Sequence, residues 1–347
     1  MKHLSLLSLI MGVLLPAFPA EKPWTLAVLP DTQFYMNEKR GDIITSMTRW
    51  IADNSEKENI RFVVHVGDIV NKAEDTNEWS YATAALDLLN GKVPYGLCRG
   101  NHDMGEPFLP NCGPDASRWK DADGKLYDWV AGFSPSGMSS AQLITAGKRR
   151  ILFLELDYQC PGLLDDPQTD LGWAQGIVNT YKDVPTVVST HYYLRHNTPS
   201  SMSKDLPVEA RRGVGTGSGG IKKNSPQVLR DTFIKKNDQI FLVLCGHWFS
   251  QYHTGGTNDF GNPFYEIIAN YQNGLNGGNG FLRLMQFCPD EKVIKVSTYS
   301  PWLKRMMTNP VDKDDSRGLD PDLADPNGSS FTLELDWDKR FKPTGLH

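Results

Sequence analysis

Arg99-Gly100-Asn101-His102-Asp103 is the stretch from which the fold of this 347-residue chain is most directly inferred. It follows the apolar run 94–98, which is typical of the end of a strand. Gly100 allows a tight turn, so an amide, an imidazole and a carboxylate are presented together where a strand leads into a loop. Gly-Asn-His-Asp would occur by chance in about one chain of this length in several hundred. The stretch therefore indicates a functional loop.

Four further motifs occupy the same kind of position, each at the end of an apolar, strand-like run. They are Asp31-Thr32-Gln33, Gly67-Asp68, His191 and Gly246-His247. Helical patterns at 41–56 and 170–182 alternate with the strands, and Asp75 with Glu78 matches a capping box that opens another helix. This alternation predicts parallel strands with right-handed crossovers, whose carboxyl ends meet at one edge of a sheet and bind ligands there.

The last part of the chain has a different pattern, in which turn-rich segments separate short apolar runs. These runs lie at 263–271, 281–287, 292–299 and 331–337. The pattern predicts antiparallel strands.

The composition is that of a globular protein, with 39% hydrophobic and 22% charged residues. Its length alone would suggest two domains, but no linker-like stretch divides it. We therefore expect one α/β domain over 21–347, with long loops at 104–145 and 194–224, the first forming a wall over the site. The net charge of −5 argues against nucleic-acid binding, which normally needs a basic surface.

Residues 1–20 have the pattern of a signal peptide. Lys2 and His3 make a basic start, the apolar core spans 4–15, and Ala17 and Ala20 are small residues near a cleavage point. The core is too short to cross a bilayer, and no later stretch is long and apolar enough to do so. An uncleaved, buried segment is the alternative. We expect an exported protein, either periplasmic or extracellular.

The five cysteines match no zinc-binding spacing. Cys98, Cys245 and Cys288 lie in strand-like runs and are expected to be buried apolar residues. Cys112 and Cys160 lie in expected loops and are candidates for a disulfide, and the odd count leaves at least one free thiol.

The strand-end residues combine carboxylates, amides and imidazoles. The set is Asp31, Gln33, Asp68, Asn101, His102, His191 and His247. Taken singly, an aspartate there often caps a helix, and a histidine there often only makes a hydrogen bond. As an ordered set, they suit Mn, Fe, Zn or Ni better than a closed structural zinc site, which would use more cysteine.

At this point the sequence resembles the calcineurin-like metallophosphoesterases. Their motifs are Asp-x-His, Gly-Asp, Gly-Asn-His-Asp/Glu, a lone His, and Gly-His-x-His. Here the first motif ends in Gln33 and the last in Phe249, so two imidazoles of the family pattern are missing. The Leu-Pro-Asp-Thr-Gln start is similar to that of an exported bacterial branch.

The resemblance implies a four-layer α/β/β/α sandwich, with two mixed sheets flanked by helices and two divalent metal ions at the strand carboxyl ends. One ion would bind to Asp68, Asn101, His191 and His247, and the other to Asp31, Gln33 and the shared, bridging Asp68. The implied activity is hydrolysis of phosphate mono- or diesters of small molecules by a metal-activated hydroxide.

His102 stands beside a ligand but is assigned no metal, so we expect it to be catalytic. It is placed to protonate the leaving oxygen or to stabilise the transferring phosphoryl group. Asp103 is expected to orient His102 or balance its charge, and a plain loop carboxylate is the alternative.

The two departures predict unequal metal sites. The site with Gln33 should bind its ion more weakly and prefer a harder one, Mn in particular. Gln251 and His253 are candidates to replace the imidazole missing at Phe249, although a plain loop histidine is the simpler interpretation of His253. The departures also favour a second function, a catalytically weak relative that binds a phosphorylated ligand or acts as an interaction module.

Overall fold

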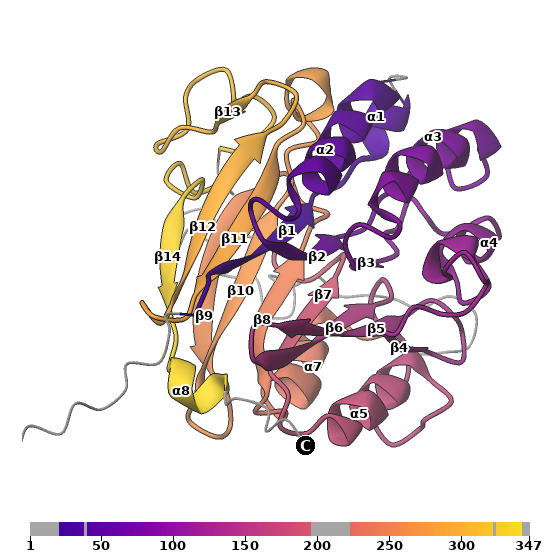
Figure 1. Cartoon of the computed structure of the whole chain (residues 1–347), viewed down its shortest axis with the longest axis vertical. Coiled ribbons are helices and arrows are strands. Elements are labelled where there is room, and N and C mark those ends of the chain that lie inside the picture. Colours follow the sequence, from indigo (N-terminus) through magenta and orange to yellow (C-terminus); the bar gives the residue numbers. More distant parts are fainter. Residues whose placement is uncertain (1–20, 38–39, 196–222, 322–323, 342–347) are drawn as a thin grey trace, which may run out of the picture.

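The computed structural model describes residues 21–37, 40–195, 223–321 and 324–341. In this part of the chain two seven-stranded sheets pack face to face, with helices on both outer sides (Figure 1). The expected α/β/β/α sandwich is therefore confirmed. The expected signal peptide and most of the expected loop 194–224 lie outside the described residues. Within the described ranges, no helix is long and apolar enough to cross a membrane.

The first sheet has the strand order β13-β12-β11-β1-β2-β3, and β14 also pairs with β12. Its parallel strands are β1 (Trp24–Leu29), β2 (Ile60–His65) and β3 (Tyr95–Leu97). Its antiparallel strands are β11 (Leu282–Cys288), β12 (Val293–Ser300), β13 (Arg305–Met306) and β14 (Phe331–Glu334).

The second sheet has the order β4-β5-β6-β7-β8-β10-β9. Its parallel strands are β6 (Arg149–Leu156), β7 (Thr186–Thr190), β8 (Ile240–Cys245) and β10 (Pro263–Ala269). Its antiparallel strands are β4 (Val130–Phe133), β5 (Ser140–Ala146) and β9 (Gln251–Thr257). The expected antiparallel pairing is confirmed for β11, β12 and β14. Strand β10 pairs antiparallel with β9 but parallel with β8, so for this strand the expectation holds on one side only.

Helices cover the outer face of each sheet. The first sheet is covered by α1 (Gln33–Asn37), α2 (Gly41–Asn54) and α3 (Thr76–Leu86), and the second by α5 (Asp170–Thr180) and α7 (Pro226–Leu229) (Figure 1). Other short pieces are α4 (Phe108–Cys112), α8 (Trp337–Arg340), a π-helical turn at Arg230–Ile234 and 3₁₀ turns at Asp87–Leu89, Ser117–Trp119 and Leu275–Gly277.

Side chains that point alternately to the two faces of each strand explain this layered arrangement. In β1, Leu26 and Val28 pack between the sheets, whereas Ala27 and Leu29 pack against the helices. The two faces of a strand alternate with period two, so an apolar residue at every position requires cover on both sides. The rings of Phe62 in β2 and Phe153 in β6 stack between the sheets with their centroids 3.8 Å apart.

The segment 104–145, expected to be a loop, contains α4, β4 and most of β5. Trp119 contacts the rings of Trp129 and Phe133 at centroid distances of 6.0 and 5.7 Å and is buried in the core. These elements are short and separated by Gly, Pro and Ser, so they give no periodic signal in the sequence.

Two smaller expectations also need correction. Asp75 caps α3, but Glu78 accepts hydrogen bonds from the backbone of Asn71 and Lys72 (2.7 and 2.8 Å), so it closes the preceding turn. All five cysteines are buried and free, and the suggested disulfide is absent because its two cysteines belong to different core clusters.

Candidate metal centre

The expected site residues lie just after strands of both sheets. Asp31, Asp68 and Asn101 follow β1, β2 and β3 of the first sheet, and His191 and His247 follow β7 and β8 of the second. Because the strands of each set are parallel, their carboxyl ends lie at the same edge. The sandwich therefore brings together residues that are more than 200 positions apart in the chain.

Four of these residues form one cluster of donor atoms. Nε2 of His191 lies 3.2 Å from Oδ2 of Asp68 and 3.2 Å from Nδ1 of His247. The same His247 nitrogen lies 2.9 Å from Oδ1 of Asn101. The ligand atoms of Asp68, His191 and His247 all lie within 4.8 Å of one another, so they can share one metal ion.

The electrostatics of the cluster favour a cation. Burial alone would lower the pKa of His191, but the carboxylates of Asp68 and Asp31 raise it to about 9. Burial and the charge of His191 lower the pKa of His247 to about 3, so this ring is neutral, as a metal ligand must be. Nδ1 of His191 donates to the carbonyl of Val66 (2.8 Å), which leaves Nε2 facing the cluster.

Asp31 is fully buried, and burial raises its pKa well above the usual range. It accepts hydrogen bonds from the backbone of His247 (3.0 Å) and from the side-chain amide of Asn270 (2.7 Å). Asn270 directly follows β10 and was missed in the sequence because that strand was expected to be antiparallel. Its position after an apolar run was the available signal.

Gln33 has a buried side-chain oxygen, Oε1, that makes no hydrogen bond within the described residues. An unsatisfied buried oxygen costs about 1–3 kcal/mol, which a bound cation would offset. Its backbone NH donates to the carbonyl of Asp68 (2.9 Å), so Gln33 is held next to that residue. The side chains of Asp31, Gln33 and Asp68 offer oxygen donors, which suit a hard divalent ion.

Neither suggested replacement for the missing imidazole serves that purpose. Nε2 of Gln251 donates to the hydroxyl of Ser329 (3.0 Å), so its side chain is committed elsewhere. The ring of His253 stacks on Phe331 with centroids 3.8 Å apart, in agreement with the plainer interpretation of this residue. Phe249 is half-buried.

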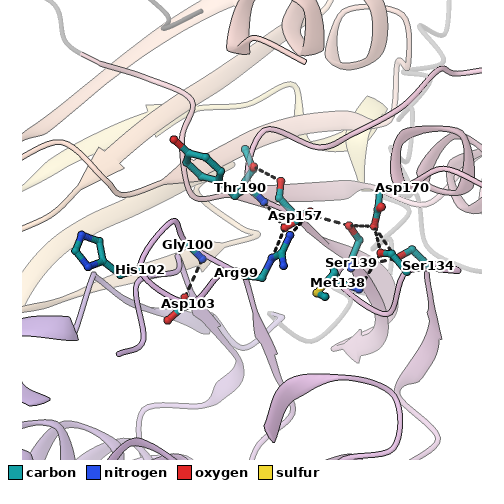
Figure 2. Close-up of polar contacts among 12 residues, drawn as sticks. Arg99, Gly100, His102, Asp103, Ser134, Met138, Ser139, Asp157, Asp170 and Thr190 are labelled. Carbon is teal, nitrogen blue, oxygen red and sulfur yellow. Dashed lines mark hydrogen bonds and ion pairs between the residues drawn. The ribbon is translucent and has the colours of Figure 1, made fainter. Parts of the chain in front are cut away.

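His102 and Asp103 point in different directions (Figure 2). The backbone NH of His102 donates to Oδ1 of Asp68 (2.9 Å), and its ring Nδ1 donates to the carbonyl of Asn71 (2.8 Å). Asp103 is fully buried, and its carboxylate accepts from the backbone of Gly100 (2.8 Å) and of Val70 (3.0 Å). Asp103 therefore shapes the turn, while the outer nitrogen of His102 is left for other partners.

Two glycines allow the motifs to approach one another. A Cβ atom on Gly100 would lie 2.1 Å from Oδ1 of Asp68, and one on Gly246 would lie 2.0 Å from Oδ1 of Asp31. Asp68 and His247 have positive φ angles of 52° and 72°. Such backbone costs about 1–3 kcal/mol per residue and is typical of functional sites.

A buried polar network links the segments that follow the strands next to the site (Figure 2). Arg99 forms a bidentate ion pair with Asp157, at 2.7 and 2.8 Å, and Thr190 donates to the carbonyl of Asp157 (3.3 Å). The Ser139 hydroxyl accepts from the backbone of Asp157 (2.9 Å) and donates to Asp170 (2.8 Å). The network joins the ends of β3, β6 and β7, and nothing in the sequence pattern indicated it.

Comparisons with known proteins agree with the fold and the motifs. The model of the calcineurin-like phosphoesterase family matches residues 25–251. The chain is 28% identical over 337 residues to the uncharacterized protein YvnB of Bacillus subtilis (strain 168), covering 93% of this chain and 22% of that protein. It thus spans about a fifth of the length of this curated relative.

Among solved structures, the chain is similar to the purple acid phosphatase PPD1 from yellow lupin (Lupinus luteus) seeds. The TM-score is 0.50 at 11% identity, over 92% of this chain and 55% of that one. A dimetal phosphatase from Danio rerio matches with a TM-score of 0.46 at 12% identity, over 81% of this chain and 97% of that one. At such identities the likeness concerns the fold alone.

The approach of Gly100 to Asp68 generates a prediction. Gly100→Ala should displace the Asp68 carboxylate and weaken Mn²⁺ binding by about tenfold or more. Calorimetric titration of the metal-stripped protein measures this affinity, and circular dichroism confirms folding. The matched control is Gly176→Ala in α5, where an added Cβ meets nothing within 4 Å and binding should not change. Unchanged Mn²⁺ affinity in a folded Gly100→Ala variant would contradict this packing.

Proposed function

Because the chain belongs to the calcineurin-like phosphoesterase family, whose members are phosphoric ester hydrolases, we propose that it hydrolyses phosphate mono- or diesters of small molecules at a site for two divalent metal ions. The observation that carries this proposal is the convergence of Asp68, His191 and His247 at one sheet edge, within 4.8 Å of one another. The buried, unpartnered side-chain oxygen of Gln33, whose backbone NH donates to the carbonyl of Asp68, supports the second ion.

The two ions would lie in different environments. One would be held by Asp68, Asn101, His191 and His247, whose donor atoms form a cluster. The other would be held by Asp31, Gln33 and the shared Asp68. When bound, two such ions lower the pKa of a water molecule and stabilise the attacking and leaving oxygens of an in-line displacement. The all-oxygen site binds more weakly and prefers Mn²⁺, because it lacks imidazole ligands.

His102 moves the proton in this proposal. Its Nδ1–H is fixed by the carbonyl of Asn71, so Nε2 is the atom that delivers a proton to the leaving oxygen. The backbone NH of His102 donates to Oδ1 of Asp68, so the position of His102 is coupled to the metal site. Asp103 is a positioning residue, since both of its oxygens bind backbone NH groups of the surrounding turns.

The leaving group provides the test of this role. His102→Gln should lower the rate of phenyl phosphate hydrolysis by about 10²–10⁴, the range for general acid–base groups. The loss should be smaller with p-nitrophenyl phosphate, because p-nitrophenolate departs without needing a proton. Phosphate release is measured with and without Mn²⁺, and bound metal by elemental analysis. His253→Gln is the matched control, since its ring stacks on Phe331 instead.

If the bound metal decreases in parallel with the activity in His102→Gln, then His102 is a metal ligand and not a general acid. An absence of turnover of mono- and diesters, with every metal tested, would instead support the alternative function, a relative that binds a phosphorylated ligand.

The unequal sites lead to a second prediction. Two successive binding steps of different affinity are expected for Mn²⁺, and Gln33→His should tighten the weaker one for Zn²⁺ by roughly tenfold, about 1.4 kcal/mol. Calorimetric titration of the metal-stripped protein measures both steps. Gln286→His, an exposed position on β11, is the control and should change neither. Two equally tight sites in the unsubstituted protein would refute the assignment.

A further inference from the structure

Three aromatic side chains stand beside the metal ligand His247. The ring centroids of Tyr192 and Trp248 lie 4.7 and 4.9 Å from that of His247, and Tyr158 lies 6.2 Å away. Tyr158 and Tyr192 also stack on each other at 5.8 Å. We call Tyr158, Tyr192 and Trp248 the aromatic wall. All three are half-buried, so part of each ring is open to solvent.

The polar side-chain atoms of the aromatic wall make no hydrogen bonds within the described part of the chain. Among the described residues, no hydrogen bond involves the hydroxyls of Tyr158 or Tyr192, and the buried Nε1–H of Trp248 has no acceptor. Residues that serve only packing usually bury such groups with a partner. The rings therefore place apolar faces, and the hydroxyls of the two tyrosines, next to the reaction centre.

Two cations border the wall. The guanidinium of Arg195 lies 4.5 Å from the ring centroid of Trp248, and the ammonium of Lys223 lies 5.4 Å from that of Tyr158. Neither forms an ion pair with a carboxylate in the described part of the chain. They hold positive charge at the rim of the site, which attracts anionic ligands.

The wall is also held in place before any ligand binds. The backbone NH of Tyr158 donates to the Asp157 carboxylate (2.7 Å), which is itself fixed by Arg99. Tyr192 lies between the buried His191 and the buried Tyr193, whose hydroxyl donates to Glu266 (2.5 Å). Preorganised rings lose little conformational freedom when a flat group stacks on them.

We propose that the aromatic wall binds a planar aromatic ring on the alcohol side of the phosphate ester, so that nucleotide-like esters are preferred over purely aliphatic ones. Stacking on the rings supplies the preference, and Arg195 and Lys223 add attraction for the negative charge of the substrate. This inference rests on the proposed function and assigns it a substrate class.

The test compares adenosine 5′-monophosphate with ribose 5-phosphate, which share the sugar and the ester and differ by the base. With the Mn²⁺-loaded protein, kcat/KM should favour the nucleotide by roughly 10- to 100-fold, the range expected for stacking of one base. Trp248→Leu and Tyr158→Leu should remove most of this preference, because kcat/KM should fall by a larger factor for the nucleotide than for ribose 5-phosphate. Trp302→Leu, an exposed tryptophan outside the wall, is the matched control.

Equal kcat/KM for the two esters, or equal losses for both in the wall variants, would overturn the inference. Calorimetric binding of both esters to the Mn²⁺-loaded His102→Gln variant gives a readout that needs no turnover. A preference for the nucleotide that depends on the wall, without hydrolysis of any ester by the unsubstituted protein, would overturn the proposed function but support the ligand class. Equal binding of the two esters would overturn the ligand class.

Discussion

The structure depends on two carboxylates that are buried at one sheet edge. Asp31 and Asp68 are 0% and 1% exposed, and buried like charges are not tolerated without compensation. His191, with its pKa raised to about 9, provides part of that compensation in the protein alone. The neutral donors His247 and Gln33 add no positive charge. A nearby cation favours the ionised form of such carboxylates, so this edge is suited to bind cations.

Support for these charges comes from neutral, fully bonded neighbours. Thr32 donates to the carbonyl of Ile69 (3.0 Å) and contacts Nε2 of His65 (3.0 Å), while Nδ1 of His65 accepts from Gly67 (3.2 Å). Burial lowers the pKa of His65 to about 3, so this ring is neutral. It connects Thr32 of the first motif with Gly67 of the second. On the other side, the ion pair of Arg99 and Asp157 ties the first sheet to the second.

The layered fold was inferred from the resemblance to the family. The sequence pattern itself was enough for the strand ends, because apolar runs and short motifs are local signals. It was not enough for Asn270, whose place at the site follows from the parallel direction of β10, or for β4 and β5, which are short and lack periodicity. The aromatic wall was also missed. Trp248 is next to His247 in the chain, but Tyr158 becomes a neighbour of His247 only when β6 and β8 enter one sheet, which is a property of the tertiary structure.

The central claim is that Asp68 joins two metal sites at this edge. Electron paramagnetic resonance of the Mn²⁺-loaded protein tests it directly, because ions about 3.5–4 Å apart through a shared carboxylate are magnetically coupled. The account predicts two Mn²⁺ per chain with a coupled spectrum, and loss of the coupling together with at least one ion in Asp68→Asn. A single bound Mn²⁺ per chain, or two ions with independent spectra, would contradict it.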